Sequence, residues 1–419
     1  MTSFKELFRV FGAIGLMSFG GPAAQVALMH RVLVDDRKWL DEAQFLRALS
    51  FCMLLPGPEA MQLATYAGWK QRGLIGGLIA GGLFVGPGAV VILALALAYG
   101  TYGQLGWVQA LFLGVKATVV VIVIEAILRV AKRALKRRSD WVIAGLAFVA
   151  LYVFALPFPA VIGIAAIYGA FRVTTAAPAS VPVVLPWARS GLIGVIGLVL
   201  WSIPLLWAYG AGQTFLLDLG LFFSKLAVVT FGGAYAVLSY MTQTVVQDYG
   251  WLTTAQMMDA LGLAETTPGP LILVTQFVGV VAGLEKGGLG LGLLGGAMVL
   301  WVTFVPCFIW IFAGAPLIDW LAGKPRLTGA LAAITAAVVG VIANLTLWFA
   351  LHVLFARQVD LQAGPVHLLL PDLTSLDLVA TGLALFAGWL ILWRHWSLLT
   401  VMGLCAGLSL GLTSALVAG

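Results

Sequence analysis

The chain alternates between long apolar stretches and short polar segments. Prominent apolar stretches lie at residues 74–99, 105–128, 191–206, 289–313 and 376–392. A helix rises about 1.5 Å per residue, so these stretches approach or cross a hydrocarbon core of about 30 Å. The pattern therefore predicts an all-α polytopic membrane protein.

Composition also places the chain in a bilayer. Of its 419 residues, 62% are hydrophobic and only 10% are charged, and the mean hydropathy is +1.05. Soluble globular proteins carry about 25% charged residues. We expect no cleavable signal peptide, because Met1–Val10 is an amphipathic start and the apolar stretch after it carries a repeated motif.

The sequence gives little support for an enzyme or a metal site. Cys52, Cys307 and Cys405 each stand alone in apolar surroundings, which indicates small buried side chains and neither a disulfide framework nor a metal site. The sequence contains no HExxH or Walker motif, and its Gly-x-Ser-x-Gly match at 407–411 lies inside an apolar run. We therefore expect a protein that is not an enzyme and that uses no cofactor.

The chain contains two copies of one unit. Phe19-Gly20-Gly21 and Pro56-Gly57-Pro58 recur as Phe231-Gly232-Gly233 and Pro268-Gly269-Pro270, both at an offset of 212 residues (231 − 19). Further identities keep this register without a gap: Ala24/Ala236, Met29/Met241, Asp36/Asp248, Trp39-Leu40/Trp251-Leu252, Ala43-Gln44/Ala255-Gln256 and Ala48-Leu49/Ala260-Leu261. Repeated hydrophobic segments that Gly and Pro interrupt at matching positions indicate the binding site of a transporter.

Each motif predicts a break in a helix at membrane depth, where non-helical backbone needs protein or a water-filled cavity to satisfy its polar groups. Ser18 and Thr230 each place a hydroxyl before two glycines and a new helix, and Pro22 suits the first turn of that helix. Short helices are likewise predicted at 59–69 and 271–281, after the two Pro-Gly-Pro motifs. Four converging helix starts would attract an anion through their exposed N–H groups.

The candidate substrate-binding residues are the motif residues and two lysines in apolar runs. They are Ser18, Gly20, Gly21, Pro22, Pro56, Gly57, Pro58, Lys116, Lys225, Thr230, Gly232, Gly233, Pro268, Gly269 and Pro270. Ionisable residues inside a bilayer are costly and usually functional. Neither lysine is repeated, since Lys225 aligns with Ala13 and, after a seven-residue insertion, Lys116 aligns with Thr335. The alternatives are ordinary turns and helix contacts for the motifs, and snorkelling to the interface for Lys225.

Glu59, Glu125 and Glu265 are candidates for a proton relay or for counter-charges to the lysines. The alternatives are charge compensation at a helix start for Glu59, pairing with Lys116 or the basic loop for Glu125, and an interfacial position for Glu265. Amide side chains are candidates for hydrogen bonding to an oxyanion or for packing between helices: Gln25, Gln62, Gln276 and Asn344.

The positions of Lys and Arg predict that the two copies are inverted in the membrane. If the N-terminus is cytoplasmic and each motif is the tip of a re-entrant hairpin, the basic residues up to Arg72 and the cluster at 129–138 stay cytoplasmic. The second copy of the basic segment 31–47, residues 243–259, contains no Lys or Arg. A long loop at 351–373 replaces the basic cluster and carries Arg357 as its only Lys or Arg. The net charge of +6 thus reflects topology rather than nucleic-acid binding.

The repeat defines the expected domains. Residues 1–172 form the first repeat, residues 173–212 form a linker with a single transmembrane helix that inverts the topology, and residues 213–419 form the second repeat. The uncharged, Ala/Pro/Val-rich stretch 174–186 is typical of a linker.

The paired motifs resemble the two-domain form of the chromate ion transporter family. Phe-Gly-Gly-(Pro/Ala) precedes Pro-Gly-Pro by 37 residues in each copy, with Trp-Leu-x-x-Ala-Gln between them, and the resemblance covers roughly 1–172 and 213–419. The second copy departs by carrying Ala234 in place of Pro22 and Leu271 in place of Glu59, so equal half-sites are not expected.

The resemblance implies chromate efflux across the bacterial inner membrane and chromate resistance, with sulfate as a tetrahedral mimic. The expected mechanism is alternating access around a dianion held near the membrane midplane. The alternatives are transport of sulfate or another oxyanion, and a passive anion channel. The expected partners are a chromate- or sulfate-type oxyanion and the lipid bilayer, with a homodimer as an option and no nucleic acid.

Overall fold

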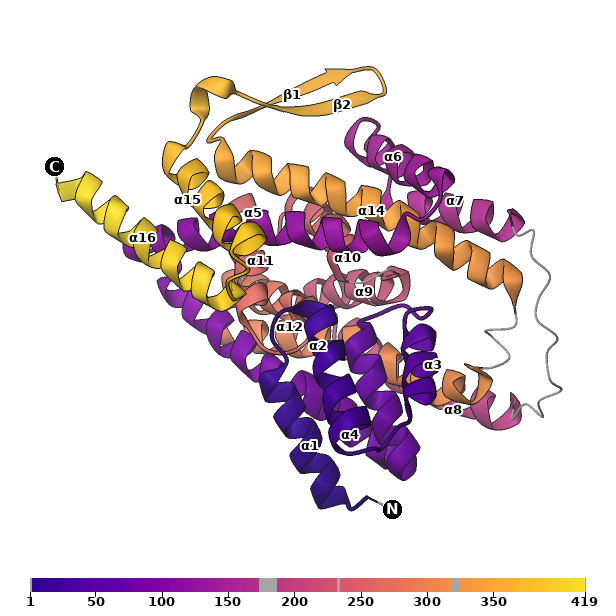
Figure 1. The fold of residues 1–419 in the computed structure, drawn as a ribbon. Coiled ribbons are helices and arrows are strands. Elements are labelled where there is room, and N and C mark those ends of the chain that lie inside the picture. Colours follow the sequence, from indigo (N-terminus) through magenta and orange to yellow (C-terminus); the bar gives the residue numbers. More distant parts are fainter. Residues whose placement is uncertain (1, 173–186, 232–233, 319–323, 419) are drawn as a thin grey trace. The chain divides into compact units, whose positions relative to one another are not determined.

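The computed structural model describes residues 2–172, 187–231, 234–318 and 324–418, and nearly all of them lie in helices (Figure 1). The first sequence copy contains α1 (Phe4–Met17), α2 (Gly21–His30), η1 (Arg31–Asp36), α3 (Glu42–Cys52), α4 (Glu59–Tyr102), α5 (Gly106–Ala134), α6 (Arg138–Tyr152) and α7 (Phe158–Phe171). The helix α8 (Trp187–Gly210) follows. The predicted linker stretch 174–186 and the motif residues Gly232 and Gly233 lie outside the described residues.

The second copy begins with α9 (Thr214–Val229), α10 (Ala234–Gln243), η2 (Thr244–Asp248) and α11 (Thr254–Thr266). It continues with η3 (Leu271–Leu273), α12 (Val274–Gly314), η4 (Ala315–Leu317) and α14 (Pro325–Leu354). The chain then forms β1 (Gln358–Ala363), β2 (Val366–Pro371), η5 (Leu373–Ser375), α15 (Leu378–Gly388), η6 (Trp389–Trp393) and α16 (Leu398–Ala418).

Long apolar helices make this a multi-pass membrane protein. In the described part of the chain, five segments are long and apolar enough to cross a bilayer: Glu59–Tyr102, Gly106–Ala134, Trp187–Gly210, Leu271–Leu317 and Pro325–Leu354. The prediction of an all-α polytopic membrane protein is confirmed. The inverted orientation of the two copies in the membrane stays a prediction.

The helices group into two compact units. Unit 1 contains Met1–Leu97, Arg172–Val237 and Ala264–Gly329. Unit 2 contains Ala98–Phe171, Leu238–Leu263 and Ala330–Gly419. Each unit therefore combines segments from both sequence copies, and all four motifs fall in unit 1.

In unit 1, α1 and α2 form a helical hairpin whose tip is the first Gly-Gly motif. The Glu6 carboxylate at the start of α1 lies 3.1 Å from the Arg37 guanidinium beyond the end of α2. The rings of Phe11 and Trp39 also lie 6.1 Å apart between centroids. Contacts between the two open ends require antiparallel helices, so the chain reverses at Ser18–Gly20.

The helix α4 is a second hairpin rather than one rod. A straight helix of its 44 residues would be about 66 Å long, far more than a bilayer core. The backbone leaves the helical region at Arg72 and Gly73, and Gly73 has φ +62°. The two arms then pack so closely that a Cβ on Gly76 would lie 2.3 Å from the Gly68 carbonyl oxygen. The whole stretch 60–68 of the first arm is buried.

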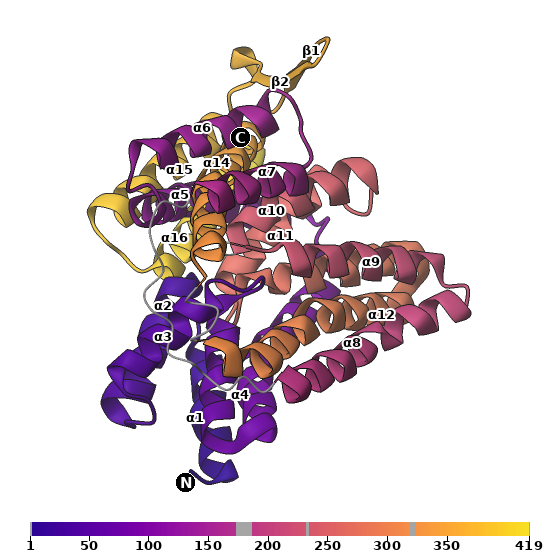
Figure 2. The ribbon, with the colours of Figure 1, turned by 90° about the vertical axis from the view of Figure 1, so that its right-hand side faces the viewer.

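The helix α12 repeats this construction in the second copy. Its backbone breaks at Gly287 and Gly288, and a Cβ on Gly295 would lie 2.4 Å from the Gly279 carbonyl oxygen. The stretch 271–283 before the break is buried throughout. The second arm of α12 lies beside α8 and α9 (Figure 2), where the Trp201 indole donates to the Val302 carbonyl at 3.0 Å. The core of unit 1 is therefore built from the two helical segments that follow the Pro-Gly-Pro motifs.

In unit 2, α5 packs against α15 and α16, with the Gly114 Cα facing the Cys405 carbonyl group. The helix α14 packs on α6, where a Cβ on Gly340 would lie 2.1 Å from the Ala144 carbonyl oxygen. The helix α5 extends to Ala134. The prediction of a loop at 129–138 is therefore wrong in its first half, because the basic residues 129, 132 and 133 lie in the last turns of α5. Positive charges there interact favourably with the negative end of the helix dipole.

The predicted long loop at 351–373 is also wrong. The helix α14 continues to Leu354, and β1 and β2 form an antiparallel hairpin from Gln358 to Pro371. Residues 363 to 366 form its turn, in which Gly364 has φ +61°. Tyr152 in α6 donates its hydroxyl to the Leu369 carbonyl at 2.6 Å, which ties the hairpin to unit 2.

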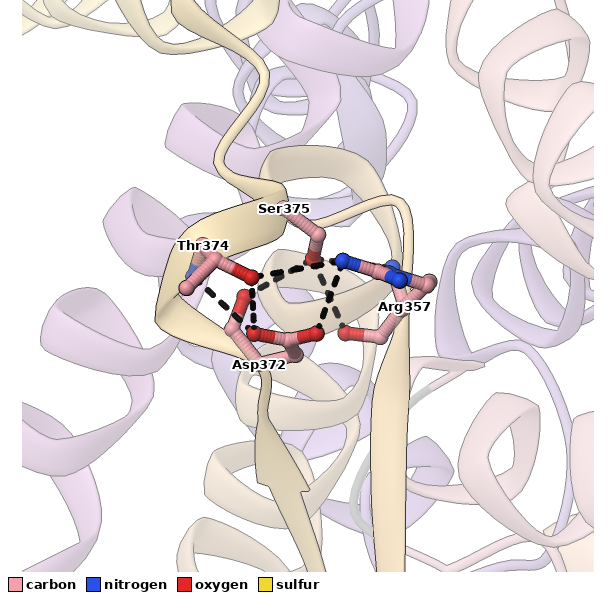
Figure 3. A network of polar contacts seen from close by, with 4 residues as sticks. All are labelled: Arg357, Asp372, Thr374 and Ser375. Atoms are coloured by element: carbon pink, nitrogen blue, oxygen red, sulfur yellow. Dashed lines mark hydrogen bonds and ion pairs between the residues drawn. The ribbon is translucent and has the colours of Figure 1, made fainter.

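A polar network closes the base of this hairpin (Figure 3). The Arg357 guanidinium lies 3.1 Å from the Asp372 carboxylate, which also accepts hydrogen bonds from the hydroxyl and the backbone N–H of Thr374 at 2.6 and 3.0 Å. The Arg357 backbone N–H donates to the Ser375 hydroxyl at 3.0 Å. The Thr374 hydroxyl and N–H, followed by the Arg357 charge, lower the pKa of the Asp372 carboxyl below its ordinary value.

We predict that this network is intact from neutral pH down to the acid range. Because the folded-state pKa of Asp372 is lowered, its contribution to stability is present above the unfolded pKa of about 3.9 and is lost as pH falls through the still lower folded value. Asp372→Asn should imitate the acid form at pH 7 and speed hydrogen exchange at residues 357–376. Asp360→Asn, on the exposed strand, is the control. Equal exchange in both variants would contradict the prediction.

Candidate functional site

The two copies of the motifs interlock through a reciprocal pair of backbone hydrogen bonds in unit 1. The Gly57 N–H donates to the Thr230 carbonyl at 2.7 Å, and the Gly269 N–H donates to the Ser18 carbonyl at 2.9 Å. The donors are repeat equivalents of one another, and so are the acceptors. Each Pro-Gly-Pro motif is therefore joined to the residue that precedes the Phe-Gly-Gly motif of the other copy. We call these two contacts the motif crossing.

The hydroxyls of Ser18 and Thr230 occupy equivalent roles as well. The Ser18 hydroxyl donates to the Ile14 carbonyl at 2.6 Å, and the Thr230 hydroxyl donates to the Leu226 carbonyl at 2.5 Å. Both side chains are buried. In this structure the two hydroxyl protons therefore satisfy the ends of their own helices, and contact of these hydroxyls with a substrate stays a prediction.

The N–H groups of two candidate residues are also engaged within the protein. Gly57 and Gly269 already donate to carbonyls, so their N–H groups are not directed at an anion. The start of α2 is different, because its N-cap, Gly20, makes no side-chain capping hydrogen bond and Pro22 occupies the first turn as predicted. Of the two Pro-Gly-Pro helices, α4 begins at Glu59 as predicted, whereas the second copy first makes the short 3₁₀ turn η3.

Glycine is required at the crossing by backbone conformation. Gly20, Gly21, Gly57 and Gly269 have φ of +83°, +76°, +115° and +90°. A Cβ on Gly57 would also lie 2.9 Å from the Cys307 sulfur and 3.0 Å from the Gln62 amide nitrogen. The motif glycines thus permit a close approach of the two copies, in addition to any contact with a ligand.

Two glutamine side chains donate hydrogen bonds to backbone carbonyls at the motif crossing. The Gln25 amide donates to the Gly269 carbonyl at 2.7 Å and to the Ser18 carbonyl at 3.2 Å, so it bridges the two copies. Its repeat equivalent is Val237, which makes the crossing asymmetric. The Gln62 amide donates to the Pro56 carbonyl at 2.7 Å. The buried amide oxygens of Gln62 and Gln276 find no hydrogen-bond partner among the described residues, and these are acceptors for a ligand or water donor.

Lys116 lies in unit 2 and forms a buried ion pair. Its ammonium lies 2.8 Å from the Asp259 carboxylate, and the two side chains are 12% and 0% exposed. The Tyr99 hydroxyl donates to the other Asp259 oxygen at 2.6 Å. Lys225, in contrast, occupies an exposed position on α9 in unit 1. The two lysines therefore differ in burial, although the sequence treats them alike.

The predicted acids have separate surroundings. Glu125 pairs with Arg129 at 2.5 Å, one turn later on α5, so its partner is the basic segment and not Lys116. Glu265 is buried beside the second Pro-Gly-Pro motif and accepts a hydrogen bond from the Tyr235 hydroxyl at 2.9 Å. Glu59 is half-buried at the start of α4. The Asn344 amide lies 3.4 Å from the Ser239 hydroxyl, which fits the predicted contact between helices.

Sequence reasoning missed Asp259, the buried partner of Lys116. A signal was available, because Asp259 aligns with Arg47 in the first copy, and a reversal of charge inside an otherwise matching stretch is conspicuous. Asp259 nevertheless lies in a segment that the topology prediction placed near the membrane surface. Its burial depends on packing between α11 and α5, which the sequence of either helix does not report.

Comparisons with known proteins place the chain in one group. The profile of the family described as Chromate transporter matches residues 5–170 and 217–411. A probable chromate transport protein of Synechococcus elongatus is 31% identical over 345 residues, which cover 82% of this chain and 83% of that protein. No solved structure matches the chain.

Two chromate transport proteins show the same level of similarity. The protein of Cupriavidus metallidurans is 31% identical over 343 residues, which cover 81% of this chain and 80% of that protein. The protein of Pseudomonas aeruginosa is 31% identical over 418 residues, which cover 97% of this chain and 92% of that protein. The similarity therefore extends across both sequence copies.

We predict that the motif crossing is sensitive to a single methyl group. Gly57→Ala should lower the free energy of unfolding by about 1–3 kcal/mol, because it combines a positive φ with overpacking against Cys307. Gly212→Ala is the matched control, since Gly212 also has a positive φ of +64° but would place its Cβ in open space. Thermal unfolding in detergent measures both. An equal effect of the two substitutions would show that crowding at the crossing is unimportant.

We also predict that the buried ion pair behaves as one unit. Lys116→Met or Asp259→Asn alone should lower the free energy of unfolding by about 3 kcal/mol, because each leaves an uncompensated buried charge, and the double variant should recover most of the loss. The exposed Glu125–Arg129 pair on the same helix is the control, with an expected coupling of about 0.3–0.5 kcal/mol. A double-mutant cycle in detergent measures both couplings. Additive single effects at Lys116 and Asp259 would contradict the prediction.

Proposed function

The chain belongs to the chromate transporter family, and we propose that it carries chromate out of the cytoplasm across the bacterial inner membrane, with its N-terminus in the cytoplasm. The observation that carries the proposal is the reciprocal joining of four helix breaks in unit 1. Broken helices are a recurring basis for substrate sites in secondary transporters, because their ends present N–H groups and carbonyls that a continuous helix would use internally. The related chromate transport proteins indicate the substrate class.

The available polar groups fit an oxyanion better than a cation. The uncapped start of α2 offers N–H groups and the positive end of a helix dipole. Lys116 and Lys225 add positive charge at two further places in the chain. We propose that in unit 1 the start of α2 and Lys225 contact the substrate, with the glycines and prolines of the motifs positioning the backbone, and that in unit 2 Lys116 contacts it.

The proposed cycle is alternating access. The two sequence copies carry matching breaks, so a rearrangement of one copy can be mirrored by the other, and inverted copies would then expose the site to opposite sides of the membrane in turn. Outward movement of a dianion is favoured by an inside-negative potential, by about 2.3 kcal/mol per charge for each 100 mV. Efflux therefore needs no nucleotide hydrolysis.

A flux measurement tests this function. Everted vesicles that contain the protein should accumulate chromate in a saturable manner that depends on the membrane potential, and sulfate should compete because it has the same shape and charge. The double variant Lys116→Met with Asp259→Asn should fold but lose at least about tenfold in chromate uptake at low concentration, equivalent to about 1.4 kcal/mol. Lys5→Ala, at an exposed position in α1, is the control and should transport normally.

The outcomes separate the alternatives. Uptake of sulfate without uptake of chromate would assign a different oxyanion to the same site. Non-saturable flux far above the turnover of a carrier would indicate a channel. The absence of both fluxes in wild-type vesicles of matched protein content would refute the proposed function.

A further inference from the structure

The structure shows Lys116 with its charge already neutralised. Its ammonium lies 2.8 Å from an oxygen of Asp259 inside unit 2, where Asp259 is fully buried. An anion can bind Lys116 strongly only if it replaces this carboxylate or approaches a neutral pair. The ion pair is therefore part of the binding equilibrium of any substrate that uses Lys116.

We propose that Asp259 is an internal substitute for the substrate, which holds Lys116 in the empty carrier and is displaced when an oxyanion arrives. This inference rests on the proposed function, and it adds the residue with which chromate competes. A carboxylate and a tetrahedral oxyanion present the same kind of acceptor oxygen to an ammonium group, at the same short distance. The dianion carries twice the charge of the carboxylate, which favours the exchange.

The partial exposure of Lys116 supports the exchange. The side chain of Lys116 is 12% exposed, whereas that of Asp259 is 0% exposed. An ammonium group carries three donors, and a single ion pair with Asp259 occupies at most one of them. An arriving anion can thus contact the ammonium before the carboxylate has left, so that the lysine need not pass through a fully unpaired state.

Tyr99 stabilises the Asp259 carboxylate when the oxyanion has displaced it from Lys116. Its hydroxyl donates to the second carboxylate oxygen at 2.6 Å, and that hydrogen bond does not involve Lys116. When the lysine turns to the substrate, the carboxylate keeps this strong donor and is not left entirely without a partner. Tyr99 is itself 6% exposed and packs edge-on against Phe112 at 5.5 Å, which holds its ring in place. We therefore assign Tyr99 as a positioning residue for Asp259.

The repeat does not copy the contacts among Lys116, Asp259 and Tyr99. The positions equivalent to Lys116, Asp259 and Tyr99 are Thr335, Arg47 and Ile318, which cannot form the same pair. One oxyanion would thus exchange with one carboxylate in each transport cycle. In the empty carrier the pair is neutral, so the return step does not carry a lone buried charge, which would be costly in a bilayer.

The test compares the KM for chromate in everted vesicles for the wild type and two single variants. Asp259→Asn removes the competing charge, so KM should fall by about fivefold or more. Exchange of external for internal chromate should continue in this variant while net efflux slows, because the empty carrier now returns with an unpaired Lys116. Tyr99→Phe removes the donor that supports the displaced carboxylate, so KM should rise. Tyr102→Phe, on the same helix and 56% exposed, is its control and should leave KM unchanged.

A purely structural ion pair gives different results. It predicts that the KM of the folded Asp259→Asn protein stays the same or rises, and either result would overturn the proposal. If Asp259→Asn does not yield folded protein, the comparison of Tyr99→Phe with Tyr102→Phe decides, because an unchanged KM in Tyr99→Phe also overturns it.

A binding measurement separates this inference from the proposed function. Absence of chromate flux in the wild type would refute the function alone. Thermal stabilisation of the purified protein by sulfate then tests the competition directly, since a bound ligand raises stability according to its dissociation constant. Sulfate should stabilise Asp259→Asn at concentrations about fivefold lower than the wild type. Equal concentration dependence in the two proteins would refute the exchange.

Discussion

Backbone polar groups inside a bilayer have no water to bind, so each break in a helix needs a partner within the protein. In unit 1 that requirement is met by the pair of hydrogen bonds from Gly57 to Thr230 and from Gly269 to Ser18. The positive φ of the motif glycines, the close approach to Cys307 and the bridging Gln25 all serve this crossing. The buried arms of α4 and α12 start from it. The position of any substrate site in unit 1 therefore depends on these two backbone contacts.

Much of this arrangement could be predicted because it is local. Gly and Pro at fixed spacing specify where a helix must break, and the repeat shows that both copies carry these motifs at matching positions. The failures are equally physical. The β-hairpin at 358–371 depends on pairing between strands whose apolar residues look like the flank of a membrane helix. The break at Arg72–Gly73, in contrast, lies between the predicted short helix 59–69 and the apolar stretch that starts at residue 74. The joining of Gly57 to Thr230 uses backbone atoms, which no side-chain pattern reports.

The sequence could not show which of the two membrane lysines has a carboxylate partner at Asp259. Lys116 stands out because a charge in an apolar run is rare, but its effect on an anion depends on Asp259 and Tyr99, which come from other helices. Lys225 gives the same signal in sequence and lies at an exposed position. The two lysines therefore have different surroundings, which the residue type does not report. The tertiary surroundings decide how strongly each lysine attracts an anion.

The reciprocal hydrogen bonds also constrain how the chain can be made. The acceptor for Gly57, the Thr230 carbonyl, is synthesised 173 residues later (230 − 57). During synthesis the first Pro-Gly-Pro segment must wait with an unsatisfied N–H until the second copy enters the membrane. The second arm of α4 equally meets Phe308 and Phe312 of α12 only after the second copy has been made. Assembly of unit 1 is thus a late event in biogenesis, and a ribosome that stalls between the copies leaves a half-protein in which the Gly57 N–H lacks its acceptor from the second copy.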